Sequence, residues 1–342
     1  MGDKITYMAF KIFYLVTSMG TAILRFLPGE ISHTISLFLL NSFNILGLIP
    51  VEEKETSNSL NLFGLNFNNQ LGISAGLDKN GDYIDSLSSL GVGFIEIGTV
   101  TPKPQKGNSK PRLFRDINNK SLINMMGFNN KGVLHLVKKL KQRRKHQTIV
   151  GVSIGKNSET PFEESIKDYK ECMTYVYEHS DYIAINISSP NTKNLRNFES
   201  VDYFLQLISS LKEKQKQLAC DHGYVPLLVK ISPDLSDQDL NNLLREVLNN
   251  DIDGVIATNT TINHNFRISK GGLSGEPLFN RSNEILVRCR NFLGPKFPLI
   301  ASGGVMSKEM YNEKLRLGAD LVQIYTGLIY KGPKLISDIL ES

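Results

Sequence analysis

The feature that most constrains the fold is a series of short β-type apolar runs separated by helical patterns. The runs number eight and cover residues 71–75, 94–98, 149–154, 182–187, 227–231, 254–257, 299–301 and 321–325. Helical periodicity fills most of the intervals, for example residues 162–179, 201–218, 236–248 and 307–317. Eight strands alternating with helices predict an α/β fold of the (β/α)8, or TIM, barrel type. A doubly wound sheet is the alternative, but no G-x-G-x-x-G motif follows the first run.

A barrel of this type carries its functional residues at the carboxyl ends of the strands, so the residues that end each run are candidates. The last two runs are followed by Gly303, Gly304, Thr326 and Gly327. Barrels commonly bind phosphate at this place through backbone N–H groups and a helix N-terminus. Because glycine lets the backbone approach an anion closely, we predict a phosphorylated cofactor or substrate here. The alternative is that these glycines only form turns.

The second run is followed by a long segment, residues 101–130, which we expect to form a loop over the barrel mouth. Asparagines gather in this segment and near other run ends: Asn124, Asn129, Asn130, Asn186, Asn191 and Asn259. Each carboxamide offers both a donor and an acceptor, so the mouth suits a neutral, amide-rich ligand. Its shortage of paired carboxylates argues against a glycosidase site.

Two lysines and one serine at the expected mouth allow several interpretations. Lys230 could form a Schiff base, as in a lyase, or place a cation beside an electron-accepting ring or a substrate carboxylate. Lys79 follows the first run and also points to the mouth. Ser189 has no His or Asp beside it in the sequence, so the pattern alone favours a capping or turn residue over a triad nucleophile.

The first 50 residues carry only five charged side chains, in a chain that is 21% charged overall. Residues 5–27 are long enough to span a bilayer. However, polar side chains recur every seventh residue opposite the apolar face, at Lys4, Lys11, Ser18 and Arg25. This periodicity predicts an amphipathic helix that lies in a membrane interface or packs on protein.

Pro28 and Gly29 break that helix, and residues 31–46 form a second apolar segment. We therefore predict a two-helix hairpin over residues 1–50, a linker over residues 51–59 and the barrel over residues 60–342. The residues alone leave open whether the hairpin docks on a membrane or only covers apolar barrel surface.

Composition excludes several other classes of protein. With 41% hydrophobic residues and a net charge of +5, the chain is not disordered, collagen-like or disulfide-rich. Its three cysteines are widely spaced, and its six histidines show no metal-ligand spacing, so we expect neither disulfides nor a metal. The basic stretch 138–145 has an apolar helical stripe and no interleaved aromatics, so we expect a solvated helix face and no nucleic-acid partner.

Eight short motifs follow one another along essentially the whole chain. They are AGLDKNG (75–81), EIGTVTP (96–102), PRLFR (111–115), MGFNN (126–130), NISSPNT (186–192), ATNTT (257–261), GGLSG (271–275) and VQIYTG (322–327). In residues, order and spacing they resemble class 2, quinone-dependent dihydroorotate dehydrogenases, which are flavin enzymes of pyrimidine synthesis.

This resemblance implies FMN in the barrel mouth and dihydroorotate beside it. The implied FMN positions are Ala75, Gly76, Leu77, Asp78, Lys79, Thr99, Ser153, Asn186, Lys230, Thr258, Gly275, Gly303, Gly304, Tyr325 and Thr326. The implied substrate positions are Lys79, Asn124, Met125, Met126, Gly127, Phe128, Asn186, Asn191, Asn259 and Thr260. Lys79 would face the substrate carboxylate and Lys230 the pyrimidine edge of the flavin, so the Schiff-base interpretation loses its support.

By the same resemblance, Ser189 is the base that removes the C5 proton while hydride passes from C6 to FMN. Phe128 and Thr192 occupy the positions that shape its proton relay. Soluble class 1 enzymes, which use fumarate or NAD, carry cysteine in place of Ser189, so this serine and the apolar head favour class 2. A Schiff-base lyase and a non-catalytic membrane scaffold are the competing functions.

For the N-terminal hairpin, the resemblance implies a membrane-docked tunnel that leads a quinone to the flavin. His33 and Arg115 would lie near its inner end, and Tyr325 between tunnel and flavin. We expect a monomer, peripheral on the cytoplasmic face of a bacterial inner membrane. A mitochondrial inner membrane is the alternative, disfavoured because no presequence precedes the first helix.

Two positions depart from the family pattern. Ser153 stands where the family usually has asparagine, which implies weaker or water-mediated contact with FMN. Lys193 and Asn194 replace a usual Pro-Gly pair in the loop that covers Ser189, and this change could alter the motion of that loop.

Overall fold

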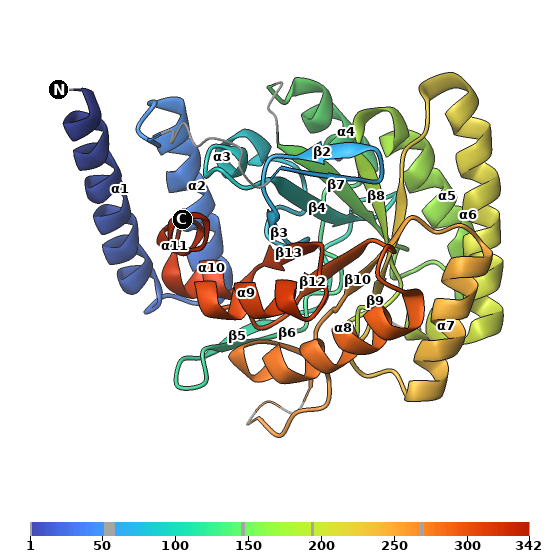
Figure 1. Cartoon of the computed structure of the whole chain (residues 1–342). Helices are drawn as coiled ribbons and strands as arrows, with labels where there is room; N and C mark the ends of the chain where they lie inside the picture. The colour runs from blue at the N-terminus through green and yellow to red at the C-terminus, as the bar shows by residue number, and fades with distance from the viewer. Residues whose placement is uncertain are drawn as a thin grey trace.

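The computed structural model describes residues 2–50, 59–144, 148–192, 195–266, 268 and 270–341, with only the backbone for residues 2–7 and 9. Figure 1 shows a barrel of strands surrounded by helices, with two N-terminal helices at one side. Most of the predicted linker, residues 51–58, lies outside the described residues, as do Lys193 and Asn194.

Eight parallel strands close into the barrel. They are β3 (Leu71–Ile73), β4 (Phe94–Val100), β7 (Ile149–Ile154), β8 (Tyr182–Asn186), β9 (Leu227–Ile231), β10 (Gly254–Ala257), β12 (Leu299–Ser302) and β13 (Leu321–Ile324). Each pairs with the next in chain order, and β13 pairs with β3 to complete the ring. The predicted barrel is confirmed, each strand ending within two residues of its predicted bounds.

Helices cover the outside of the barrel (Figure 1). They are α3 (Ile84–Ser88), α4 (Val133–Gln142), α5 (Ser165–Val176), α6 (Val201–His222), α7 (Asp237–Asn249), α8 (Phe279–Leu293), α9 (Lys308–Arg316), α10 (Thr326–Lys331) and α11 (Lys334–Leu340), with 3-10 turns η1 (Phe162–Glu164), η2 (Tyr177–His179), η3 (Leu195–Glu199) and η4 (Glu276–Leu278). Helix α7 shows why these segments form helices that pack on the barrel. Its Leu240, Leu243, Leu244 and Val247 form one buried stripe, and Ser236 caps its first turn by accepting from Asp239 N at 3.1 Å.

The amino-terminal end of the barrel is closed by a small hairpin, β1 (Leu60–Leu62) and β2 (Leu65–Phe67). Phe67 is fully buried and packs edge-to-face on Phe94, with ring centroids 5.7 Å apart. Because this hairpin fills the amino-terminal end, a ligand site inside the barrel must open at the carboxyl ends of the strands.

The segment that we expected to be a long loop, residues 101–130, is in part a sheet. It contains β5 (Leu113–Asp116) and β6 (Ser121–Asn124), and β6 also pairs antiparallel with β11 (Gly272–Gly275). The expectation missed these strands because they are four residues each and gain their pairing from a segment far away in the sequence.

The two predicted N-terminal helices are present as α1 (Gly2–Leu24) and α2 (Gly29–Ile45). α1 packs against α10 and α11, and α2 packs against α3 and β5 (Figure 1). Within the described ranges, no helix combines the length and hydropathy needed to cross a bilayer.

Candidate active site

A cavity opens at the carboxyl end of the barrel and encloses about 1060 Å³ of empty space, including open solvent at its mouth. It gathers most of the residues predicted for FMN and substrate, together with the predicted base Ser189. These are Ala75, Gly76, Lys79, Thr99, Asn124, Met126, Gly127, Phe128, Asn186, Ser189, Asn191, Lys230, Thr258, Asn259, Thr260, Gly275, Gly303, Gly304, Tyr325 and Thr326. Residues from seven of the eight barrel strand ends, all but that of β7, and from the β5–β6–β11 sheet therefore meet in one site.

Some predicted residues do not line this cavity. The Asp78 carboxylate accepts N–H groups of Asn80, Asp82 and Tyr83 at 2.8–3.3 Å, so it holds the turn that positions Lys79. Burial raises the pKa of Asp78 to about 6. The other predicted FMN, substrate and relay residues that do not line the cavity are Leu77, Met125, Ser153 and Thr192.

Ser153 supports the cavity wall from behind. Its hydroxyl lies 2.8 Å from Thr99 Oγ1, which in turn accepts from Asn186 Nδ2 at 2.8 Å. The short serine therefore orients two cavity residues through hydrogen bonds. Thr192 differs, because its hydroxyl is buried without a hydrogen-bond partner among the described residues.

One end of the cavity is a cradle of glycines. Gly275, Gly303 and Gly304 all have positive φ, at +98°, +126° and +78°. A Cβ on Gly304 would lie 2.5 Å from Phe279 Cα, and one on Gly303 2.8 Å from Ser282 Oγ. Only glycine fits these close approaches to the first turn of α8, and the dipole of that helix favours an anion nearby. The cradle therefore suits a phosphate group.

Lys230 is a buried cation at the cavity floor. Its Nζ lies 3.0 Å from Ser74 Oγ, 3.1 Å from Glu96 Oε1 and 3.4 Å from Gln323 Oε1. An ion-paired ammonium is a poor nucleophile, so this pairing disfavours the Schiff-base alternative. Glu96 and Gln323 were not among the residues predicted for the site. A glutamate within an apolar strand was the available signal, because a buried carboxylate requires a cation or several donors.

Four of the predicted asparagines form two hydrogen-bonded pairs of amides in the cavity wall. Asn191 Nδ2 donates to Asn124 Oδ1 at 2.8 Å, and Asn259 Nδ2 lies 3.3 Å from Asn186 Oδ1. Beside them, Lys79 Nζ donates to Gly76 O at 2.8 Å. Burial, followed by the charge of Arg112, lowers the pKa of Lys79 to about 8. The site thus combines amides with one cation suited to a carboxylate.

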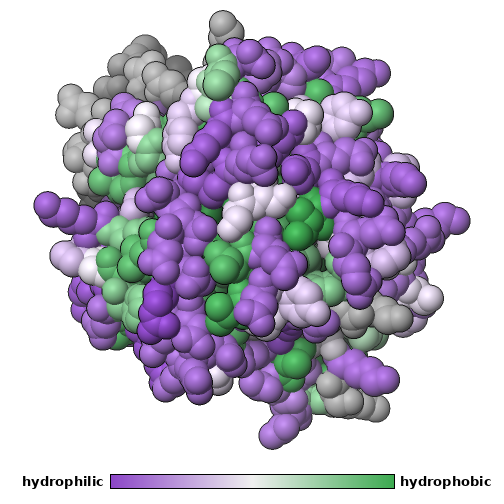
Figure 2. Space-filling view, turned by 90° about the vertical axis from the view of Figure 1, so that its right-hand side faces the viewer, coloured by the Kyte–Doolittle hydropathy of each residue, from purple (hydrophilic) through white to green (hydrophobic). Residues whose placement is uncertain are grey.

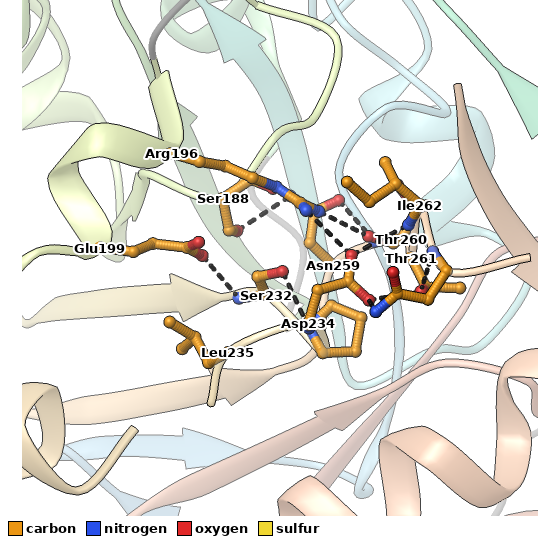
Figure 3. A network of polar contacts seen from close by, with 12 residues as sticks. Ser188, Arg196, Glu199, Ser232, Asp234, Leu235, Asn259, Thr260, Thr261 and Ile262 are labelled. Carbon is orange, nitrogen blue, oxygen red and sulfur yellow. Dashed lines mark hydrogen bonds and ion pairs between the residues drawn. The ribbon is translucent and has the colours of Figure 1, made fainter. Parts of the chain in front are cut away.

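Ser189 lies in the segment that follows β8, and its hydroxyl accepts from Asn191 N at 3.4 Å. Figure 3 shows how Arg196 ties this segment to the next two strand ends. Its guanidinium donates to Ser188 O at 3.2 Å, Asp234 Oδ2 at 2.9 Å and Thr260 O at 3.1 Å. Asp234 also accepts from the hydroxyl of Thr261, so one cluster links the segments that follow the adjacent strands β8, β9 and β10.

A second cavity lies between the N-terminal helices and the barrel, with about 1230 Å³ of empty space and mostly apolar walls. His33, Arg115 and Tyr325, the three predicted quinone-site residues, all line it. Tyr325, Leu113 and Leu122 line both cavities, so the two spaces meet at Tyr325. His33 Nε2 lies 2.7 Å from Leu77 O, and burial lowers the pKa of His33 to about 4.

Arg115 connects this cavity to the turn between the helices. It donates to Leu27 O at 3.0 Å and to Ser32 Oγ at 2.8 Å. The connection fixes α2 relative to the β5–β6 hairpin.

The N-terminal helices expose an unusual amount of apolar surface. Among the described residues, 14 of the 22 exposed large apolar side chains lie between residues 8 and 48, and Phe26 is 90% exposed. On the side of α1 that faces the barrel, Thr21 lies against Gly332 and the Arg25 guanidinium donates to Tyr330 O. The opposite face of the molecule is mostly hydrophilic, with small separate apolar patches (Figure 2). Apolar surface concentrated on one side marks an interaction site.

Comparison with known proteins agrees with this geometry. The family described as dihydroorotate dehydrogenase matches residues 58–342. A dihydroorotate dehydrogenase (quinone) of Neisseria meningitidis serogroup B is 46% identical over 95% of this chain and 98% of its own length. That of Aliivibrio salmonicida is 46% identical over 92% of this chain and 96% of its own.

A solved structure of dihydroorotate dehydrogenase from Eimeria tenella, in complex with ferulenol, is also similar. It superposes with a TM-score of 0.84 at 31% identity, covering 91% of this chain and 89% of that one. The chain therefore belongs to the dihydroorotate dehydrogenase family, on its quinone-dependent branch.

Proposed function

We propose that this protein oxidises dihydroorotate to orotate in pyrimidine synthesis, with FMN as hydride acceptor and a membrane quinone as final electron acceptor. The observation that carries the proposal is the pair of cavities that meet at Tyr325. One is lined by amides, lysines and a glycine cradle, and the other is mainly apolar. A polar substrate and an apolar oxidant could therefore reach one shared cofactor from two sides.

The residues present fit FMN. The cradle of Gly275, Gly303 and Gly304 would take its phosphate, because added side chains would block the close backbone approach. Lys230, fixed by Glu96, would lie beside the ring and favour its anionic reduced form. When bound, FMN supplies the hydride acceptor that the side chains of this chain lack.

The amide-rich wall fits the cyclic ureide of dihydroorotate. Asn124, Asn186, Asn191 and Asn259 each offer a donor and an acceptor to ring N–H and C=O groups. Lys79 would pair with the carboxylate, and the substrate would thereby be held in one orientation.

Ser189 would take the proton from C5 as hydride leaves C6, and the C5–C6 double bond of orotate forms. A serine hydroxyl is a weak base at neutral pH, so the proton needs an onward path. Thr192, whose buried hydroxyl has no partner among the described residues, is the proposed next acceptor, and Phe128 would close the site against water.

We assign residues 1–50 to a quinone-binding and membrane-docking unit, joined by residues 51–59 to the FMN barrel of residues 60–342. Support comes from the outward apolar face of α1 and the cavity beneath it, where His33 and Arg115 offer polar groups to a quinone oxygen. We propose a monomer that is peripheral on the cytoplasmic face of a bacterial inner membrane. The relatives named above that are bacterial support this location.

Anaerobic titration tests this function directly. Dihydroorotate should bleach the visible absorbance of the bound flavin, and a soluble quinone should then restore it. Fumarate or NAD restoring the colour in place of quinone would assign the protein to class 1. Absence of flavin together with borohydride trapping of substrate on Lys230 would instead support a lyase, and a bound flavin that stays oxidised would support a scaffold.

A further inference from the structure

Lys314 is a buried cation that the proposed mechanism does not use. It lies on α9 with no exposed surface, and its Nζ donates to Ser282 Oγ at 2.7 Å. The same Nζ lies 5.1 Å from the centre of the Phe279 ring. None of the ion pairs between described residues includes it, and burial lowers the pKa of Lys314 to about 7.

The two groups that Lys314 contacts also form the back of the glycine cradle. Ser282 Oγ lies 2.9 Å from Phe279 O and 3.1 Å from Gly303 O, and these two carbonyls share its one hydrogen. Phe279 begins α8 and packs directly against Gly304. A single hydroxyl therefore separates the ammonium of Lys314 from the backbone that would surround a phosphate.

An ammonium enclosed in protein is costly unless an anion compensates its charge. Glu313 is the one acid that raises the pKa of Lys314, and it is the adjacent residue in the chain and not in hydrogen-bond contact. The cradle, by contrast, is shaped for an anion on the other side of Ser282. A phosphate monoester dianion there would supply the missing negative charge.

We propose that Lys314 is a positioning residue whose charge stabilises the phosphate of bound FMN through Ser282 and the Gly303 backbone. The inference rests on the FMN binding proposed above and extends it to a residue outside the cavity wall. Through this charge, the chain would bind a phosphorylated flavin more tightly than the same flavin without its phosphate.

The test compares FMN with riboflavin, which lacks the phosphate. Flavin-free wild-type protein, Lys314→Met and Arg316→Met are titrated with each flavin, and binding is followed by quenching of flavin fluorescence. Arg316 is exposed on the same helix and provides a control for loss of one positive charge. We expect Lys314→Met to weaken FMN binding about tenfold, as for loss of one partly screened charge contact, and to leave riboflavin binding unchanged.

Thermal unfolding of the same flavin-free proteins separates this role from a structural one. Because methionine removes a buried charge that no ion pair compensates in the flavin-free protein, flavin-free Lys314→Met should unfold at the wild-type temperature or higher. FMN should raise that temperature less than in wild type. Ser282→Ala should also reduce the preference for FMN.

Equal weakening of FMN and riboflavin, or a lower unfolding temperature of flavin-free Lys314→Met, would assign Lys314 to packing and overturn the inference. If Lys314→Met keeps the full wild-type preference for FMN over riboflavin, the inference about Lys314 is refuted and the proposed function is not affected. Failure of the wild-type protein to bind FMN would refute the proposed function as well.

Discussion

At the scale of single residues, the proposed proton acceptor, Ser189, is a different residue from the two cations of the site, Lys79 and Lys230. Ser189 is buried, and the hydrogen bond found for its hydroxyl comes from a backbone N–H, so no acid or base of the described chain activates it directly. Lys79 and Lys230 are both enclosed cations, but Lys230 has a carboxylate partner and Lys79 donates to a backbone carbonyl.

Replacement of Ser189 by alanine should abolish most flavin reduction by dihydroorotate while FMN stays bound. Loss of a positioned base slows such a step by about 10²–10⁴-fold, because the proton has no acceptor in the transition state. Anaerobic stopped-flow absorbance gives the rate, and the flavin-to-protein ratio is the control. Reduction at the wild-type rate would refute the assignment of Ser189 as base.

The binding of orotate should weaken as pH rises through the pKa of Lys79, which lies at about 8. The protonated lysine attracts the ligand carboxylate, and this attraction is present below pH 8 and lost above it. The dissociation constant of orotate, measured by the change in flavin absorbance across this range, should rise with pH in wild type. Lys79→Met should bind orotate weakly without this pH dependence, and an unchanged slope would contradict the role of Lys79.

At the scale of elements, the active site depends on how the segment after β8 is attached to its neighbours. Arg196, on η3, reaches the carbonyl just before Ser189, the carboxylate after β9 and the carbonyl of Thr260 after β10 (Figure 3). These three contacts come from three strand ends, so the cluster sets the position of Ser189 relative to the amide wall.

Substitution of Arg196 by lysine keeps the charge but cannot make three divergent contacts at once. We expect flavin reduction to slow by up to about 10²-fold, because a small displacement of a reacting group is enough for such a loss. The FMN content should stay unchanged. Arg245→Lys, on the exposed face of α7, is the matched control, and equal effects of the two substitutions would exclude the bracing role.

At the scale of the whole molecule, two compartments of different polarity share a wall formed by Leu113, Leu122 and Tyr325. The barrel provides a polar cavity, the N-terminal helices cover an apolar one, and Tyr325 lines both. Exposed apolar residues on α1 and α2 place the apolar compartment next to the surface most suited to lipid.

Removal of residues 1–46 should therefore reduce quinone turnover far more than flavin reduction. The truncated protein loses most walls of the apolar cavity but keeps those of the barrel cavity. Stopped-flow rates of the two half-reactions, each measured separately, give the comparison. Equal losses in both would show that the helices serve the stability of the barrel.

Local patterns in the sequence predicted the barrel well because each strand and helix carries its own periodicity. The strands end close to their predicted bounds, and α4 buries Val133, Leu136 and Leu140 while Lys138 and Lys141 stay exposed, as its apolar stripe indicated. The β5–β6–β11 sheet escaped prediction, because short strands acquire their identity from a distant partner.

By itself, the sequence determined the eight-stranded barrel, the amphipathic head and the residues at the strand ends, since periodicity and glycine placement are local properties. Only the tertiary structure decided that Glu96 pairs with Lys230, that Arg196 braces Ser188, and that Lys314 lies behind the glycine cradle. Charges far apart in the chain are brought together by closure of the barrel, and their pairing depends on burial that no local pattern encodes.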